Sequence, residues 1–268
     1  MWIAVVLGVL IGAIMGIMGA GGGILAVPVL VVGLHWSMQQ AAPVALVAVA
    51  AGAIVGALDG FRHRLVRYKA ALLMATCGIP MTHVGQQWAH ALPQYLLMGG
   101  FAALMVVVAR RFYRQAQSHN PAAEDVLQLA FIRPSTGKFI WTPVTASVLG
   151  GIGAFTGLMT GLLGVGGGFL IVPLMRRFTN LSLPGVVATS LFLIALVSSG
   201  GVINALNSGA QLPALETSGF VLAMVSGMLI GRTVSRRLNM RQVQMGFAGL
   251  LWALSTYLVI KAWGLYPL

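Results

Sequence analysis

The chain has 268 residues, of which 58% are hydrophobic and only 7% are charged. A soluble domain carries about 25% Asp, Glu, Lys and Arg, so this composition excludes a soluble globular protein, and the apolar content excludes a disordered one. Sixteen basic residues against four acidic ones give a net charge of +12. In a membrane protein, an excess of Lys and Arg indicates mainly which loops face the cytoplasm. We therefore expect no nucleic-acid partner.

Uncharged stretches predict eight apolar segments, most of them close to the 20 residues that a membrane-spanning helix needs. A charged linker, residues 110–141, separates them into two halves, residues 1–109 and 142–268. In chain order the predicted segments are 2–32, 37–58, 70–88 and 93–109, followed by 142–175, 184–206, 217–235 and 241–260.

The two halves begin with related sequences. Residues 16–28 read GIMGAGGGILAVP and residues 161–173 read GLLGVGGGFLIVP, with eight of thirteen positions identical. The same spacing pairs Gly12 with Gly157. A motif that opens each half at a fixed spacing indicates internal duplication.

The basic residues discriminate between two topologies. If every segment crossed the membrane once, ten basic residues would face the cytoplasm and six the outside. If 142–175 instead enters and leaves on the same side, fifteen face the cytoplasm and only Lys261 faces outside. The positive-inside rule favours the second arrangement, with the linker 110–141 cytoplasmic.

Segment length favours the same arrangement. Residues 2–32 and 142–175 are long for one crossing and short for two, so each is predicted to be a hairpin of shortened helices folded at its glycines. A hairpin plus three crossings inverts one half relative to the other. We therefore predict an all-α, multi-pass protein of the bacterial inner membrane, built from two inverted repeats.

The glycine clusters fall where each hairpin would turn, and irregular backbone at membrane depth requires shielding by protein or a watery cavity. Beyond Gly19–Gly23 and Gly164–Gly168, helices are expected to restart over Ile24–Leu30 and Phe169–Met175. Their first N–H groups carry the positive end of the helix dipole and favour an anion. The alternative is close helix packing through small residues. A phosphate-binding loop is excluded, because the motif follows an apolar helix and no lysine follows it.

The paired motifs at 16–28 and 161–173 resemble the duplicated signature of the TauE/SafE sulfite exporter family of membrane permeases, over nearly the whole chain. Ala188–Leu191, which reads ATSL, resembles that family's small-hydroxyl segment, whereas the matching Pro43–Leu46 has no hydroxyl. The resemblance implies export of small anions such as sulfite or organosulfonates, by alternating access of the two halves. A passive anion channel of the same fold and a permease for an unrelated small organic anion remain alternatives.

Polar residues inside the predicted spans are further candidates. Thr189 and Ser190 either donate hydrogen bonds to an oxyanion or bond their own helix. His83 and Arg232 each fall five residues after a glycine in the third segment of a half, and are expected at opposite membrane faces, bound to an anion or snorkelling. Asp59, beside Arg62, is expected in a boundary ion pair.

Together these considerations give one set of residues expected to bind a small anionic substrate. The histidines and the single cysteine lack metal-ligand or nucleophile spacing, so we expect no cofactor, no metal and no enzymatic activity. The candidate substrate-binding residues are Gly19, Gly21, Gly22, Gly23, Gly164, Gly166, Gly167, Gly168, Thr189, Ser190, Asn204, His83 and Arg232.

Overall fold

The fold is described from a computed structural model. Parts of the predicted linker, including Glu124 and Asp125, and the basic residues Arg236 and Arg237 lie outside the described residues. The structure describes residues 2–117, 129–133, 138–209, 213–235, 238 and 240–264.

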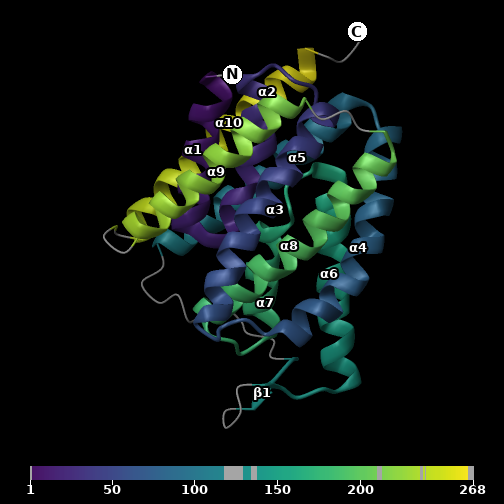
Figure 1. Ribbon diagram of the computed structural model, residues 1–268, viewed down its shortest axis with the longest axis vertical. Helices are drawn as coiled ribbons and strands as arrows, with labels where there is room; N and C mark the ends of the chain where they lie inside the picture. The colour runs from purple at the N-terminus through teal and green to yellow at the C-terminus, as the bar shows by residue number, and fades with distance from the viewer. Residues whose placement is uncertain are drawn as a thin grey trace.

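The described residues are predominantly helical, which confirms the predicted class (Figure 1). The first half contains α1 (Trp2–Met18), a 3₁₀ helix η1 (Gly19–Leu25), α2 (Ala26–Gly33), α3 (Met38–Arg62), α4 (Tyr68–Ala91) and α5 (Gln94–Gln117). A short antiparallel pair, β1 (Ile132–Arg133) and β2 (Lys138–Phe139), follows. The second half contains α6 (Pro143–Leu163), α7 (Gly168–Phe178), α8 (Leu183–Asn207), α9 (Ala214–Ser235) and α10 (Met240–Gly264).

Local sequence explains several helix boundaries. Ser37 and Gln40 form a capping box in which each side chain accepts the backbone N–H of the other residue, so α3 begins at Met38. The hydroxyl of Thr142 accepts the N–H of Thr145 at the start of α6. At its other end α6 stops at Gly164, whose left-handed backbone (φ 70°) favours glycine.

Six helices among the described residues, α3, α5, α6, α8, α9 and α10, are long and apolar enough to cross a membrane. Helix α1 has 17 residues, and α4 has 24 but carries a polar group of side chains near its end. Helix α5 continues to Gln117, so the first basic residues of the predicted linker belong to a helix. Arginines can extend a spanning helix in this way because their stems reach the membrane surface.

Glycines bring pairs of helices from different halves into backbone contact. A Cβ added at Gly12 would collide with the Met224 carbonyl of α9, and one added at Gly157 would collide with the Gly78 carbonyl of α4. Small residues allow such close approach between helices that lack a hydrophobic driving force in lipid. Helix α1 thus packs along α9 as α6 packs along α4.

Helices α3 and α8 lie side by side at the centre and run antiparallel. Gly56 of α3 faces Leu191 of α8, and Gly201 of α8 faces Leu46 of α3. Residues early in one helix therefore meet residues late in the other. The pair runs between the two ends of the molecule. The beginning of α1 and the end of α10 lie at the top of Figure 1, and α7 and β1 lie at the bottom.

The two glycine-broken segments return toward the end from which they start. The end of α2, at Gly33, contacts Leu7 and lies close to Ile3 at the beginning of α1. In the second half, the Phe178 carbonyl at the end of α7 accepts the N–H of Ala130, and Ile140, near the start of α6, donates to Phe131. Hydrogen bonds of Ala130 and Phe131, which precede α6 in the sequence, thus connect the end of α7 to the start of α6.

The glycine contacts generate a prediction about stability. Gly157→Ala places a methyl group against the Gly78 backbone, which cannot move without displacing α4. We expect a loss of roughly 1–3 kcal/mol, as for other overpacked interiors, seen as a lower melting temperature of the purified protein. Gly151→Ala, on the same helix at an exposed position with no neighbour within 4 Å, is the matched control and should leave it unchanged. Equal melting temperatures for the two variants would contradict the packing argument.

Candidate anion-binding site

The two glycine turns meet at the centre of the molecule. A Cβ at Gly23 would lie 3.4 Å from the Val165 carbonyl of the other turn and 3.5 Å from the side chain of Val49 on α3. Gly166 lies against Val49 as well as Ile194 of α8. Both turns are thus enclosed by the central helix pair, which shields their irregular backbone from lipid.

The two turns differ in backbone conformation, and after the first turn the α-helix restarts later than expected. In the second turn Gly164, Gly166 and Gly167 have positive φ, and α7 restarts at Gly168, one residue before the predicted position. In the first turn only Gly19 is left-handed (φ 72°). The first turn therefore continues as a 3₁₀ helix through the predicted restart at Ile24, and an α-helix resumes only at Ala26.

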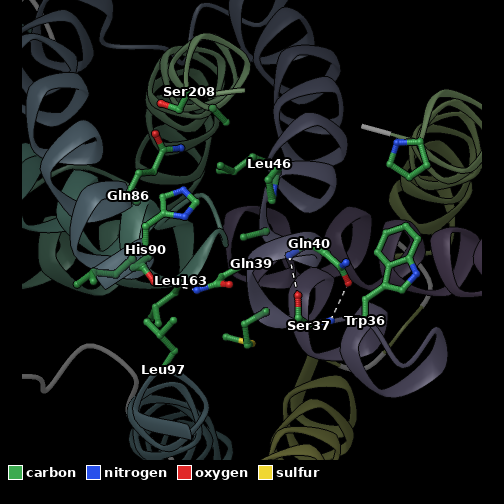
Figure 2. A pocket seen from close by; sticks show the side chains of 18 of the residues that line it. Trp36, Ser37, Gln39, Gln40, Leu46, Gln86, His90, Leu97, Leu163 and Ser208 are labelled. Atoms are coloured by element: carbon green, nitrogen blue, oxygen red, sulfur yellow. Dashed lines mark hydrogen bonds between the residues drawn. The ribbon is translucent and has the colours of Figure 1, made fainter. Parts of the chain in front are cut away.

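A cavity of about 680 Å³, here called the glutamine cavity, lies at one end of the central pair (Figure 2). Figure 2 shows Gln86 and His90 on one side of it, Gln39 and Gln40 between, and Trp36 on the other side. Its remaining polar lining comes from Ser37, Ser208 and Glu216, and no Arg or Lys is among the described residues that line it.

A second cavity of about 350 Å³, here called the arginine cavity, lies beside the first glycine turn. Arg111 of α5, Arg176 of α7 and Arg232 of α9 line it, together with Gly19 and Gly21. Among the described residues that line it there is no Asp or Glu. Guanidinium groups are the donors with which proteins bind anionic oxygens.

Corresponding positions of the two halves line the two cavities. Gly161 contacts the Gln86 backbone nitrogen beside the glutamine cavity, and Gly16 contacts the Arg232 backbone nitrogen beside the arginine cavity. Leu46 of α3 lines the first and Leu191 of α8 the second. These contacts make Gln86 the residue equivalent to Arg232. The sequence spacing from Gly78 and Gly227 instead pairs His83 with Arg232, and that pairing aligns α4 and α9 incorrectly.

His83 and Asn204 lie together in a chain of hydrogen bonds between α4 and α8. Gln87 donates to His83 Nε2 (2.9 Å), His83 Nδ1 contacts the Asn204 side-chain oxygen, and Asn204 donates to Gln86. Gln86 Nε2 then donates to the Gly201 carbonyl (2.9 Å). With His83 protonated on Nδ1, each donor in this chain has an acceptor.

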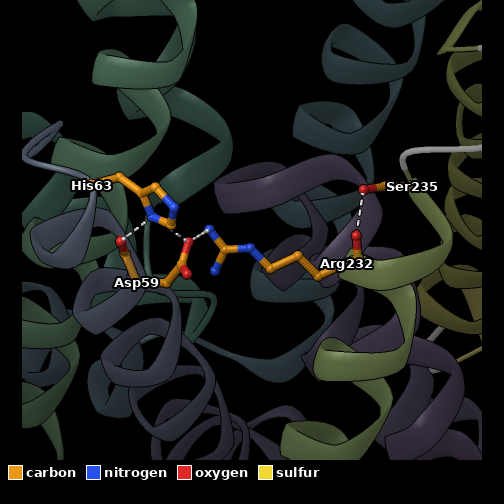
Figure 3. A network of polar contacts seen from close by, with 4 residues as sticks. All are labelled: Asp59, His63, Arg232 and Ser235. Carbon is orange, nitrogen blue, oxygen red and sulfur yellow. Dashed lines mark hydrogen bonds and ion pairs between the residues drawn. The ribbon is translucent and has the colours of Figure 1, made fainter.

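Arg232 pairs with Asp59, the single acidic residue of α3 (Figure 3). In Figure 3 the carboxylate lies between the Arg232 guanidinium and the His63 ring, whose Nδ1 is 2.9 Å from the Asp59 carbonyl oxygen. The expected boundary ion pair therefore exists with a different partner. The structure places Arg232, not the neighbouring Arg62, against Asp59, because α9 packs beside the end of α3.

The two hydroxyl candidates on α8 are buried among protein groups. Thr189 accepts the Arg67 N–H (3.0 Å) at the start of α4, and Ser190 donates to the Val186 carbonyl (2.7 Å) of its own helix. Ser198 differs from both: its hydroxyl is fully buried, lies beside Gly166 and has no hydrogen-bond partner. The described residues contain no cluster of three or more His, Cys, Asp or Glu side chains able to hold a metal ion.

Several residues that line the two cavities are not among the candidates expected from sequence. Arg111 and Arg176 belong to the basic residues expected at the cytoplasmic face, yet they line the arginine cavity together with Arg232. Gln86 follows the predicted candidate His83 by less than one helical turn, yet it takes the position equivalent to Arg232. A stricter alignment of α4 with α9 would have identified it.

The comparisons with known proteins agree with the resemblance of the glycine motifs. The family model described as "Sulfite exporter TauE/SafE" matches residues 4–258. A relative named "Probable membrane transporter protein YunE", from Bacillus subtilis, is 25% identical over 252 residues, covering 91% of each chain. A "Probable membrane transporter protein" from Xylella fastidiosa is 26% identical over 268 residues, covering 96% of this chain and 94% of its own. No solved structure matches this chain.

The family match extends from α1 into α10 and includes both glycine turns, both cavities and the described helices long and apolar enough to cross a membrane. The fold, the two motifs and the relatives therefore lead to one conclusion: the chain belongs to the TauE/SafE family of membrane transporters.

Proposed function

We propose that this transporter moves small sulfur-containing oxyanions, sulfite or organosulfonates, out of a bacterial cell. The arginine cavity is the observation that carries the proposal, because Arg111, Arg176 and Arg232 line the same space. Arginine presents a planar array of donors that matches sulfite and sulfonate oxygens as it matches carboxylate and phosphate. The apolar part of the wall, which includes Phe112, suits the carbon chain of an organosulfonate.

The mechanism we propose is alternating access of two inverted halves, residues 1–109 and 142–268, joined by a cytoplasmic linker. Equivalent helices α3 and α8 pack antiparallel, and equivalent positions line cavities at opposite ends of that pair. Both observations support inversion. A rocking motion would then expose a central site first to one cavity and then to the other.

The central site in this proposal lies at the glycine turns, between the two cavities. Gly167 is the N-cap of α7 and provides no side-chain hydrogen bond to the helix. The N-terminal end of the helix dipole favours an anion. The unpartnered Ser198 hydroxyl beside Gly166 supplies a further donor. Buried hydroxyls in proteins are normally paired, and an oxyanion would complete this one.

The glycine turn at the arginine cavity can be tested without disturbing the fold. A Cβ at Gly21 meets only Phe112, at an ordinary distance of 3.5 Å, so Gly21→Val should fold while its side chain narrows the cavity. We expect sulfite or sulfonate efflux from proteoliposomes to fall at least about tenfold, with the melting temperature little changed. Gly100→Val, at an exposed position of α5 with no neighbour within 4 Å, is the matched control.

Undiminished efflux in Gly21→Val would remove the arginine cavity from the transport path. The wild-type protein in the same assay separates the carrier from the channel. A carrier saturates with substrate concentration, whereas flux that rises linearly with it would replace alternating access by a passive anion channel.

The orientation can be tested with single cysteines, since Cys77 is the protein's own cysteine and can be replaced by alanine. We expect a membrane-impermeant maleimide to label Ser208→Cys, at the glutamine cavity, in intact cells. Arg177→Cys, exposed at the end of α7, should react only after the cells are permeabilised, because that end carries the basic residues. Labelling of both variants from the same side would contradict the inverted arrangement.

A further inference from the structure

The ends of the central helix pair carry two equivalent polar bridges of different charge. Asp59 of α3 is separated from Asn204 of α8 by the same spacing that separates Gly16 from Gly161. Arg232 of α9 is equivalent to Gln86 of α4 through their contacts with these two glycines. The Asp59–Arg232 bridge therefore corresponds to the Asn204–Gln86 bridge at the opposite end.

The two bridges differ in whether an anion can replace one of their partners. In the bridge at the glutamine cavity, the amides of Gln87, Asn204 and Gln86 each donate one hydrogen bond, and neither Asn204 nor Gln86 carries a charge. In the other bridge, a cation at the arginine cavity is neutralised by a carboxylate. A sulfite or sulfonate group presents the same kind of charged oxygen as that carboxylate, so it can take the same donors.

The charged bridge is also accessible to solvent. The side chains of Arg232 and Asp59 are 39% and 40% exposed. Ion pairs with such exposure contribute little to stability, because water and salt screen them. The pair is thus poorly suited to hold the fold together and well suited to exchange its carboxylate for another anion.

We propose that Asp59 is an internal competitor of the substrate, occupying the Arg232 guanidinium until an anion in the arginine cavity displaces it. This inference rests on the proposed function and names Asp59 as a specificity-determining residue. Displacement removes the ion pair between α3 and α9, so an anion would break this bridge as it binds. The neutral bridge at the other end offers no equivalent exchange, which makes anion capture stronger at the linker end.

The experiment measures binding of two probes, sulfite and methanesulfonate, to the purified full-length protein. Apparent affinity falls in proportion to the time that a competitor occupies the site. Asp59→Asn should therefore lower the apparent Kd for at least one probe by about tenfold. Glu216→Gln, which removes one negative charge away from the arginine cavity, measures the effect of net charge alone and should lower neither Kd by more than about twofold.

A second variant keeps the test decisive if Asp59→Asn does not fold. The double variant Asp59→Asn with Arg232→Gln reproduces at the arginine cavity the pair found at the other end. We expect it to keep the wild-type melting temperature and to lose binding of both probes by at least about tenfold. A double variant that binds them as the wild type does would overturn the proposal.

An Asp59→Asn variant with unchanged or weaker binding, including the case in which neither probe binds, would also overturn it. The proposed function is judged separately by efflux of the wild-type protein. Transport of these anions without tighter binding in Asp59→Asn would leave the transport proposal standing and remove Asp59 as competitor.

Discussion

Close contact between glycine and the backbone of a neighbouring helix sets the register on which the rest of the molecule depends. Gly12 and Gly16 leave no space between α1 and α9, and Gly157 and Gly161 do the same between α6 and α4. In lipid, where apolar surface alone gives no preference between helices, such steric fit decides which residues face each other. If either helix shifted along its partner, a residue with a side chain would replace the glycine, and its Cβ would collide with a backbone carbonyl oxygen.

This register gives the two ends of one architecture different electrostatic character. Equivalent positions hold Gln86 at one cavity and Arg232 at the other, and their partners on the central pair are Asn204 and Asp59. The Asp59–Arg232 bridge therefore carries charged groups at the position where the Asn204–Gln86 bridge carries amides.

Much of the helical arrangement could be predicted from the sequence, because each helix depends on its own residues. Most uncharged stretches gave helices within a few residues of their observed ends, as at α8 (Leu183–Asn207) for the predicted 184–206, whereas α5 continues beyond the predicted end at residue 109 to Gln117. The first glycine turn was less predictable. Gly21, Gly22 and Gly23 continue as a 3₁₀ helix, although the equivalent Gly166 and Gly167 adopt left-handed backbone, because glycine permits both conformations and the surrounding helices select one.

By itself the sequence determined the membrane class, the helical segments, the repeated glycine motif and the family resemblance, because each depends on composition or on short-range spacing. Only the tertiary structure decided that Arg232 takes the place of Gln86, that Asp59 pairs with Arg232, and that three arginines surround one cavity. These relations join residues far apart in the chain. They depend on how the helices pack, and side-chain charge patterns along a single segment carry no record of that packing.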